Sequence, residues 1–276
     1  MDDYFVFEFI SNNLFKQFIE ILNIIINQEE NNSKDITLRL THDGIYIIRM
    51  TKSDMSQYCL KLIFNTNSFV EYKINHELEI IFNGQTFIKT CKNIQKNNDD
   101  HIKILYEKSE LKIIITNKIK VKTETIILND NNISCYIPQD KPLTMDITFK
   151  DSFYKFNTID FTNLKKSINL KTETVNISLF EDKYIVFKSR SQGTSPLHIL
   201  YGVLSHNENN ENNEINETRI VINTKILNLL AKLNILTNTV NLHQSYKNNI
   251  IKIFGEFIHP KNNKIGEIEI LLCDKN

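Results

Sequence analysis

The chain resembles itself when it is shifted by about 140 residues, and this internal similarity limits the possible folds more than any other feature of the sequence. The pairs aligned by this shift include Asn83 with Asn223, Phe87 with Leu227, Cys91 with Ala231, Lys92 with Lys232, Leu111 with Ile251 and Ile113 with Ile253. Identity between the halves is low, but the order of expected elements repeats with a constant offset. We therefore interpret the chain as two copies of one unit; the alternative is the loose alignment that any two domains of mixed helix and sheet would give.

The first copy is predicted to combine two helices with antiparallel strands. Residues 11–27 carry the clearest helical pattern, with apolar side chains recurring on one face, and residues 84–95 carry a second, shorter one. Alternating, β-branched-rich segments predict the strands 35–40, 44–50, 58–64, 70–74, 101–107 and 111–117. This order predicts an α+β fold that reads helix, meander, helix, hairpin.

The second copy is expected to follow the same plan. The 140-residue shift places its first helix at 151–167, with Phe153, Phe156 and Ile159 on the apolar face. We place the first domain at 1–122, a connecting loop at 123–141 and the second domain at 142–276. The segment Ser205–Thr218 is a low-complexity run of Asn and Glu, so we expect a mobile surface loop there.

Composition is that of a globular protein rather than a membrane-spanning or polybasic one. Of the 276 residues, 41% are hydrophobic and 24% charged, and 33 basic residues balance 33 acidic ones. The apolar runs are far shorter than the ~20 residues that a membrane helix needs. The chain begins Met1-Asp2-Asp3, acidic where a secretory signal is basic, so we expect a protein that is not secreted.

The motifs that usually mark catalysis or cofactor binding are absent from the sequence. The four cysteines form no CxxC pair, which argues against a zinc site, and the six glycines form neither nucleotide-binding fingerprint. The seven histidines are scattered singly, and no HExxH or GxSxG occurs. We therefore expect no enzymatic activity, no cofactor and no metal.

Several segments, in the right order, resemble the family of eukaryotic-type sliding DNA clamps, the proliferating cell nuclear antigens. The similar segments are Asp43–Met50, which looks like the G-[VI]-x-L-x-x-M strand, Phe69–Ile74, Leu78–Lys92, Ile137-Pro138 and Thr224–Val240. The resemblance covers nearly the whole chain. It implies a DNA clamp fold with two duplicated helix-and-antiparallel-sheet domains and a homotrimeric ring of chains. The drift from the family pattern fits a divergent viral clamp, which would act in the nucleus or in a cytoplasmic viral replication factory.

The resemblance also implies a function, that of a processivity factor that encircles double-stranded DNA. In this role it tethers DNA polymerase and other replication and repair enzymes, and a clamp loader is a further candidate partner. The strand near 111–121 of one chain would pair with the strand near 195–203 of the next, and ring closure would cover both sheet edges.

Lysines on the polar helix faces are the candidate DNA-binding residues, because attraction between lysine and phosphate does not depend on sequence and allows sliding. Lys89, Lys92 and Lys96 recur at i, i+3 and i+7, opposite the apolar face of their helix. The full set is Lys16, Lys89, Lys92, Lys96, Lys155, Lys225 and Lys232. Lysine also covers many solvated helix faces with no role in binding.

Matching residues to the family places a partner-binding pocket around five apolar residues. They are Met50, Leu128, Ile137, Ile250 and Leu272. Ile250 and Leu272 alternate within strands, so the sheet interior is an equal alternative for them. Asp54 stands where the family has histidine, which favours a dedicated partner.

Two other functions remain open from the sequence. One is a clamp-fold accessory or transcription factor that forms no ring. The other is a structural protein with no DNA role.

Overall fold

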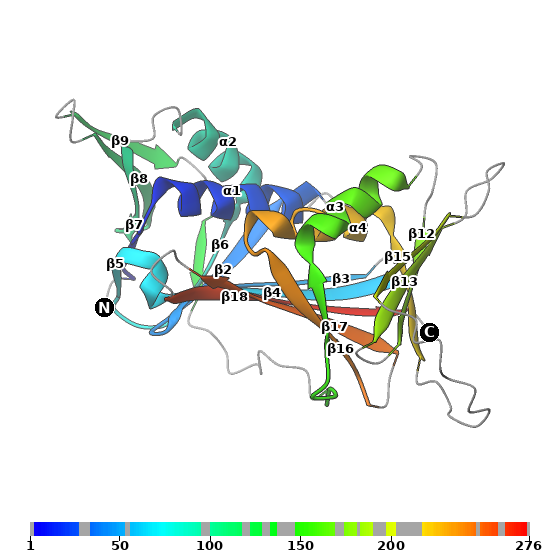
Figure 1. Ribbon diagram of the computed structural model, residues 1–276. Helices are drawn as coiled ribbons and strands as arrows, with labels where there is room; N and C mark the ends of the chain where they lie inside the picture. Colours follow the sequence, from blue (N-terminus) through cyan, green and yellow to red (C-terminus); the bar gives the residue numbers. More distant parts are fainter. Residues whose placement is uncertain are drawn as a thin grey trace, which may run out of the picture. The chain divides into compact units, whose positions relative to one another are not determined.

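The computed structural model of the chain describes residues 3–27, 34–52, 56–94, 100–117, 122–128, 133–136, 147–168, 174–180, 183–189, 197–202, 217–246, 249–258 and 263–274. These residues fall into two compact units (Figure 1). The first unit comprises Met1–Ile48, Lys61–Leu143 and Phe257–Glu267. The second comprises Arg49–Leu60, Thr144–Glu256 and Ile268–Asn276, so each unit includes strand segments from both halves of the sequence.

The first copy of the repeat, which supplies most of the first unit, has two helices and two antiparallel sheet portions. Its elements are β1 (Phe5–Phe9), α1 (Asn12–Asn27), β2 (Asp35–Thr41), β3 (Gly44–Lys52), β4 (Ser56–Asn65), η1 (Thr66–Ser68), β5 (Phe69–Ile74), β6 (Leu78–Asn83), α2 (Gly84–Ile94), β7 (Asp100–Glu107), β8 (Glu110–Asn117), β9 (Lys122–Leu128) and β10 (Ser134–Tyr136). One sheet has the order β5-β1-β7-β8-β9, and the other portion has the order β10-β6-β2-β3-β4.

The second copy of the repeat, which supplies most of the second unit, has the same arrangement. Its elements are β11 (Tyr154–Asn157), α3 (Thr158–Ser167), β12 (Thr174–Phe180), β13 (Tyr184–Ser189), β14 (Leu197–Gly202), β15 (Glu217–Asn223), α4 (Thr224–Leu230), η2 (Leu233–Ile235), β16 (Thr239–Gln244), β17 (Ile250–Ile258) and β18 (Lys264–Asp274). One sheet has the order β14-β13-β12-β15, and the other portion has the order β18-β17-β16-β11. The strand order matches that of the first unit, with β6-β2-β3-β4 corresponding to β15-β12-β13-β14 and β1-β7-β8-β9 to β11-β16-β17-β18. The predicted α+β class and duplication are confirmed.

In the first unit the core lies beneath α1, whose apolar stripe predicted it. Leu14, Phe18, Ile21 and Leu22 of this helix are all buried. Helix α2 packs beside α1, and Gly84 at its start allows this approach, because a Cβ atom there would clash with side chains of α1 and β2. An aromatic cluster around Phe9 fills the space between the helix and the sheets.

The structure corrects two sequence expectations about elements and adds one strand that was not expected. The predicted helix 151–167 is strand β11 followed by a helix that begins at Thr158, so Phe156 is buried in a strand while Phe153 and Ile159 are exposed. The predicted loop 123–141 contains β10 and nearly all of β9. Strand β1 has no counterpart among the expected elements, because Phe5–Phe9 is a short apolar run without clear periodicity.

The predicted loop Ser205–Thr218 falls almost entirely outside the described residues, and Glu217 and Thr218 belong to β15. No helix in the described ranges is long and apolar enough to cross a membrane.

Candidate nucleic-acid interface

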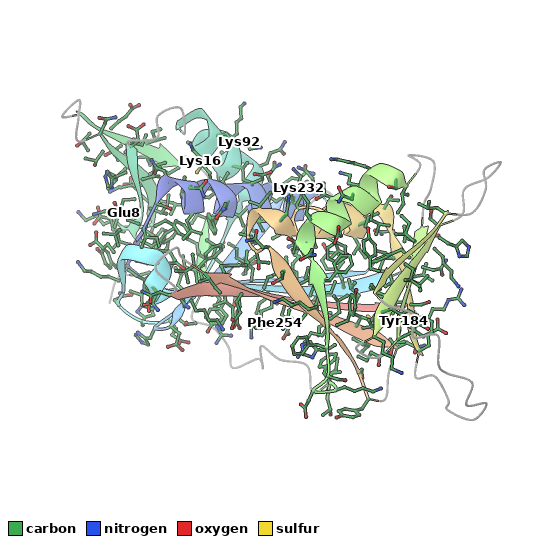
Figure 2. The ribbon with its side chains drawn as sticks, viewed as in Figure 1. Glu8, Lys16, Lys92, Tyr184, Lys232 and Phe254 are labelled. Atoms are coloured by element: carbon green, nitrogen blue, oxygen red, sulfur yellow. The ribbon has the colours of Figure 1, made fainter. Side chains whose placement is uncertain are left out.

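In the first unit, α1 and α2 carry lysines on the side opposite their buried residues. Helix α2 buries Phe87, Ile88 and Cys91, which leaves Lys89 and Lys92 exposed on its other face. Lys16 of α1 is half-buried. Figure 2 labels Lys16 and Lys92 on these adjoining helices. The pattern that predicted these three lysines on polar helix faces is therefore realised.

In the second unit, α3 and α4 also pack against each other and expose lysines. Lys225 is exposed on α4, and Lys232 is exposed in the turn between α4 and η2 rather than on a helix. Lys165 and Lys166 are exposed in the last turn of α3. The sequence analysis missed Lys165 and Lys166 because it placed the start of this helix seven residues too early. A pair of basic residues is typical of the last turn of a helix, and this signal could have identified them.

Of the other candidate lysines, one lies on a strand and one is outside the described residues. Lys155 is exposed on strand β11, not on a helix, because the chain at this position is extended. Lys96 lies outside the described residues. The helix surfaces therefore include Lys16, Lys89, Lys92 and Lys225 from the predicted set, with Lys232 in an adjoining turn.

The four helices are more positive than the chain as a whole. They contain six lysines, namely Lys16, Lys89, Lys92, Lys165, Lys166 and Lys225, against the two carboxylates Glu20 and Asp160, which gives a net charge of +4. The whole chain has a formal net charge of zero, so the rest of it carries the opposite excess. Clustered charge of one sign attracts a polyanion even when the net charge of the protein is zero.

Asparagine caps fix where the second helix of each unit begins. Asn83 ends β6, and its Oδ1 accepts a hydrogen bond from the backbone N–H of Thr86 at 2.9 Å. Asn223 ends β15, and its Oδ1 accepts from the N–H of Ile226 at 2.9 Å. These two residues are aligned by the sequence repeat. Both copies therefore turn from strand to helix through the same contact, which orients the lysines of α2 and α4 relative to their sheets.

The five residues expected to form a partner-binding pocket do not share one environment. Met50 on β3 is 58% exposed, and Ile250 on β17 is half-buried. Leu272 on β18 has 0% exposure and packs in the core of the second unit, so it has no surface with which to contact a partner. Leu128 ends β9, and Ile137 lies outside the described residues.

The described residues contain no group of three or more His, Cys, Asp or Glu side chains that could hold a metal ion. Burial raises the pKa of the Cys91 thiol far above its usual range, which keeps this cysteine protonated on the buried face of α2.

The architecture is that of the DNA clamp fold, with duplicated α+β domains. The chain is similar to the crystal structure of the proliferating cellular nuclear antigen from Entamoeba histolytica, with a TM-score of 0.71. The similarity covers 99% of both chains at 16% sequence identity, so it establishes the fold. No family model and no curated protein matches the sequence.

The two asparagine caps yield a first prediction. Replacing Asn83 or Asn223 with alanine removes an acceptor from the first turn of a helix, and each change should lower the free energy of unfolding by about 1 kcal/mol. The measurement is chemical denaturation followed by circular dichroism. Asn83→Asp and Asn223→Asp, which keep the acceptor oxygen, are the matched controls and should stay close to wild type. Equal losses from alanine and aspartate would show that the cap is not the stabilising contact.

Proposed function

We propose that this protein is a sliding clamp that encircles duplex DNA and tethers DNA polymerase and other replication or repair enzymes. The observation that carries the proposal is a clamp fold over the whole chain whose helices are net positive while the chain is neutral. Such a surface attracts phosphates without reading bases, so the protein is held on DNA and remains free to slide. The clamp performs no bond chemistry in this role.

A ring follows from the repeat if the pairing inside the chain is also used between chains. Within one chain, β4 of the first copy is the hydrogen-bonded neighbour of β18 of the second. Their repeat counterparts, β14 and β9, lie at sheet edges, and neither has an outer neighbour among the described strands. Pairing β14 of one copy with β9 of the next would reproduce the β4–β18 arrangement, head to tail, and remove both edges.

The sequence analysis expected two strands at these edges, and the structure differs for one of them. The segment 195–203 contains edge strand β14, as predicted. The strand near 111–121 is β8, which lies inside its sheet between β7 and β9, so the edge belongs to β9 instead. The proposed interface therefore uses Lys122–Leu128.

Ring formation predicts a solution mass of three subunits. We expect Leu200→Asp to lower this mass to that of one subunit, because Leu200 is 40% exposed on β14 and a buried carboxylate would oppose pairing. The measurement is light scattering with and without nicked circular DNA. Val70→Asp is the matched control, since Val70 is 67% exposed on β5, an edge that this ring does not use. A wild-type mass of one subunit at every accessible concentration would contradict the ring and favour a clamp-fold accessory protein.

DNA binding is predicted to depend on the lysines of the helices. Changing Lys89 and Lys92 together to glutamine should weaken binding to all duplex sequences alike and reduce the slope of log affinity against log salt by about one unit per lost phosphate contact. The control is Lys108→Gln with Lys188→Gln, which removes the same charge from exposed positions away from the helices. If both pairs change the slope equally, or neither does, the helix surfaces are not the DNA site. No duplex affinity at low salt would favour a structural role.

Partner docking is proposed at the exposed Met50 and the half-buried Ile250, with Leu128 and Ile137 as further candidates. A clamp of this kind works by raising the local concentration of an enzyme whose terminal segment it binds. We expect Met50→Ala and Ile137→Asp each to weaken binding of a peptide from the C-terminus of the cognate polymerase by about tenfold, as measured by calorimetric titration. Val70→Ala, an exposed change elsewhere, should leave the affinity unaltered. Unchanged affinity in both test variants would place docking at another surface.

A further inference from the structure

Aromatic rings and a lysine gather on one face of the sheet in the second copy of the repeat. Alternate residues of β16 and β17 are buried in the core, which leaves His243, Lys252 and Phe254 on the other face. His243 and Lys252 are cross-strand partners in the register of these two strands. Figure 2 labels Phe254 on β17, on the opposite side of the sheet from Lys232. These residues therefore lie on the face that is turned away from α3 and α4.

The segment that precedes β11 adds two phenylalanines to this face. Phe149 forms an isolated bridge with Ser245, and Lys252 Nζ lies 4.6 Å from the centroid of the Phe149 ring. The centroid of the Phe153 ring lies 5.3 Å from that of the His243 ring. These contacts join Phe153, His243, Lys252 and Phe149 into one continuous surface, which we call the aromatic–lysine patch.

A bulge holds the ring of Phe153 at the surface of this patch. The N–H of Lys150 donates to the carbonyl of Gln244 at 2.9 Å, so the three residues 151–153 lie opposite the single residue His243. His243 Nδ1 in turn lies 3.2 Å from the Lys150 carbonyl, to which its N–H donates. The Phe153 side chain is 43% exposed although its ring rests on another ring. A ring that is both exposed and held in place loses little freedom when a ligand stacks on it.

The charges around the patch favour a ligand that combines a flat ring with one nearby anionic group. Burial lowers the pKa of His243, so Phe153 rests on an imidazole that is neutral at neutral pH. Among the described residues, Lys252 has no carboxylate at ion-pair distance, and its ammonium group lies over a phenylalanine ring. Asp151 and Glu269 act electrostatically on His243, so the patch is not uniformly positive. Stacking should therefore contribute more to binding than charge does.

We propose that the aromatic–lysine patch binds single-stranded nucleic acid, with an unpaired base stacked on the exposed ring of Phe153 and a phosphate beside Lys252. Every base has a π face, so an exposed aromatic ring beside a lysine binds single strands with little dependence on sequence. The bases inside a duplex are already stacked on both faces, so the patch selects single strands over duplex DNA. This site is separate from the lysines of the helices and does not depend on ring formation.

The first test uses the fact that the chain contains no tryptophan. Phe153→Trp places a fluorophore at the proposed stacking position, in a full-length chain that also carries Lys89→Gln and Lys92→Gln to weaken binding at the helices. We expect oligothymidylate and oligouridylate both to quench its emission in a saturable way, because the proposed contacts do not involve the ribose 2′-OH. Quenching by one of them alone would support the site and assign it to DNA or to RNA. A DNA duplex of the same length should leave the emission unchanged.

The second test separates stacking from simple apolar contact. In the same Lys89→Gln, Lys92→Gln background, Phe153→Leu keeps an apolar side chain but removes the π face, and Phe153→Tyr keeps both. By fluorescence anisotropy with labelled oligothymidylate, we expect the leucine variant to bind at least about fivefold more weakly and the tyrosine variant to bind within about twofold of the background protein.

The third test addresses the proposed phosphate contact. Lys252→Gln should reduce the slope of log affinity for the single strand against log salt by about 0.7 of a unit. Lys188→Gln, an exposed change on β13, is the matched control and should leave the slope unaltered.

Three results would overturn the proposal. One is equal binding of the single strand by the background protein and Phe153→Leu, and another is unquenched Phe153→Trp emission with both oligonucleotides. The third is a lower solution mass for Phe153→Leu with unchanged oligonucleotide binding, because the patch would then be a contact between copies of the chain. Loss of duplex binding at the helices would leave all three measurements interpretable, so the two nucleic-acid sites can fail separately.

Discussion

The pairing of β4 with β18 is the constraint on which the rest of the structure depends. It places the last strand of the sequence against a strand from the first quarter, so the first unit is complete only when residues 257–267 have joined it. Several contacts secure this junction: Asn65 Nδ2 donates to the Lys264 carbonyl at 3.1 Å, Ser68 Oγ donates to the Ile265 carbonyl, and Phe64 packs on Phe257 with ring centroids 5.8 Å apart. A Cβ atom at Gly266 would clash with the Ile63 carbonyl, which explains the glycine.

The pairing of these two distant strands closes the sheet without the helices, so one face of each helix remains at the surface. Their buried faces complete the cores of the units, and the asparagine caps Asn83 and Asn223 set the same strand-to-helix geometry in both. The helices differ from the chain as a whole in net charge, with six lysines against two carboxylates in a neutral chain. For a protein that must hold DNA without stopping on it, charge placement matters more than net charge.

The sequence predicted elements well where local periodicity was strong and poorly where position depended on distant contacts. Helix α1 was evident from its apolar stripe, and α2 with Lys89 and Lys92 was evident for the same reason. Helix α3 was misplaced because α3 begins 146 residues after α1, so the constant shift fails there and β11, with Lys155, was interpreted as helix. Leu272 shows the same limit, because its burial in β18 depends on strands from other parts of the chain, and alternation alone could not distinguish core from surface.

The sheet edges show how duplication and divergence work together in this fold. A repeated unit brings the same edges twice: one β4-type and one β9-type strand meet inside the chain as β4 and β18, and the other two, β14 and β9, lie at the edges of their sheets among the described strands, where the proposed ring would pair them. The β1-type strand is covered by β5 in the first copy, whereas the described residues of the second copy leave β11 uncovered. Beside this strand, Asp151, Ser152 and Phe153 form a bulge opposite His243, and Lys155 is exposed, so both features restrict which strand can pair with this edge.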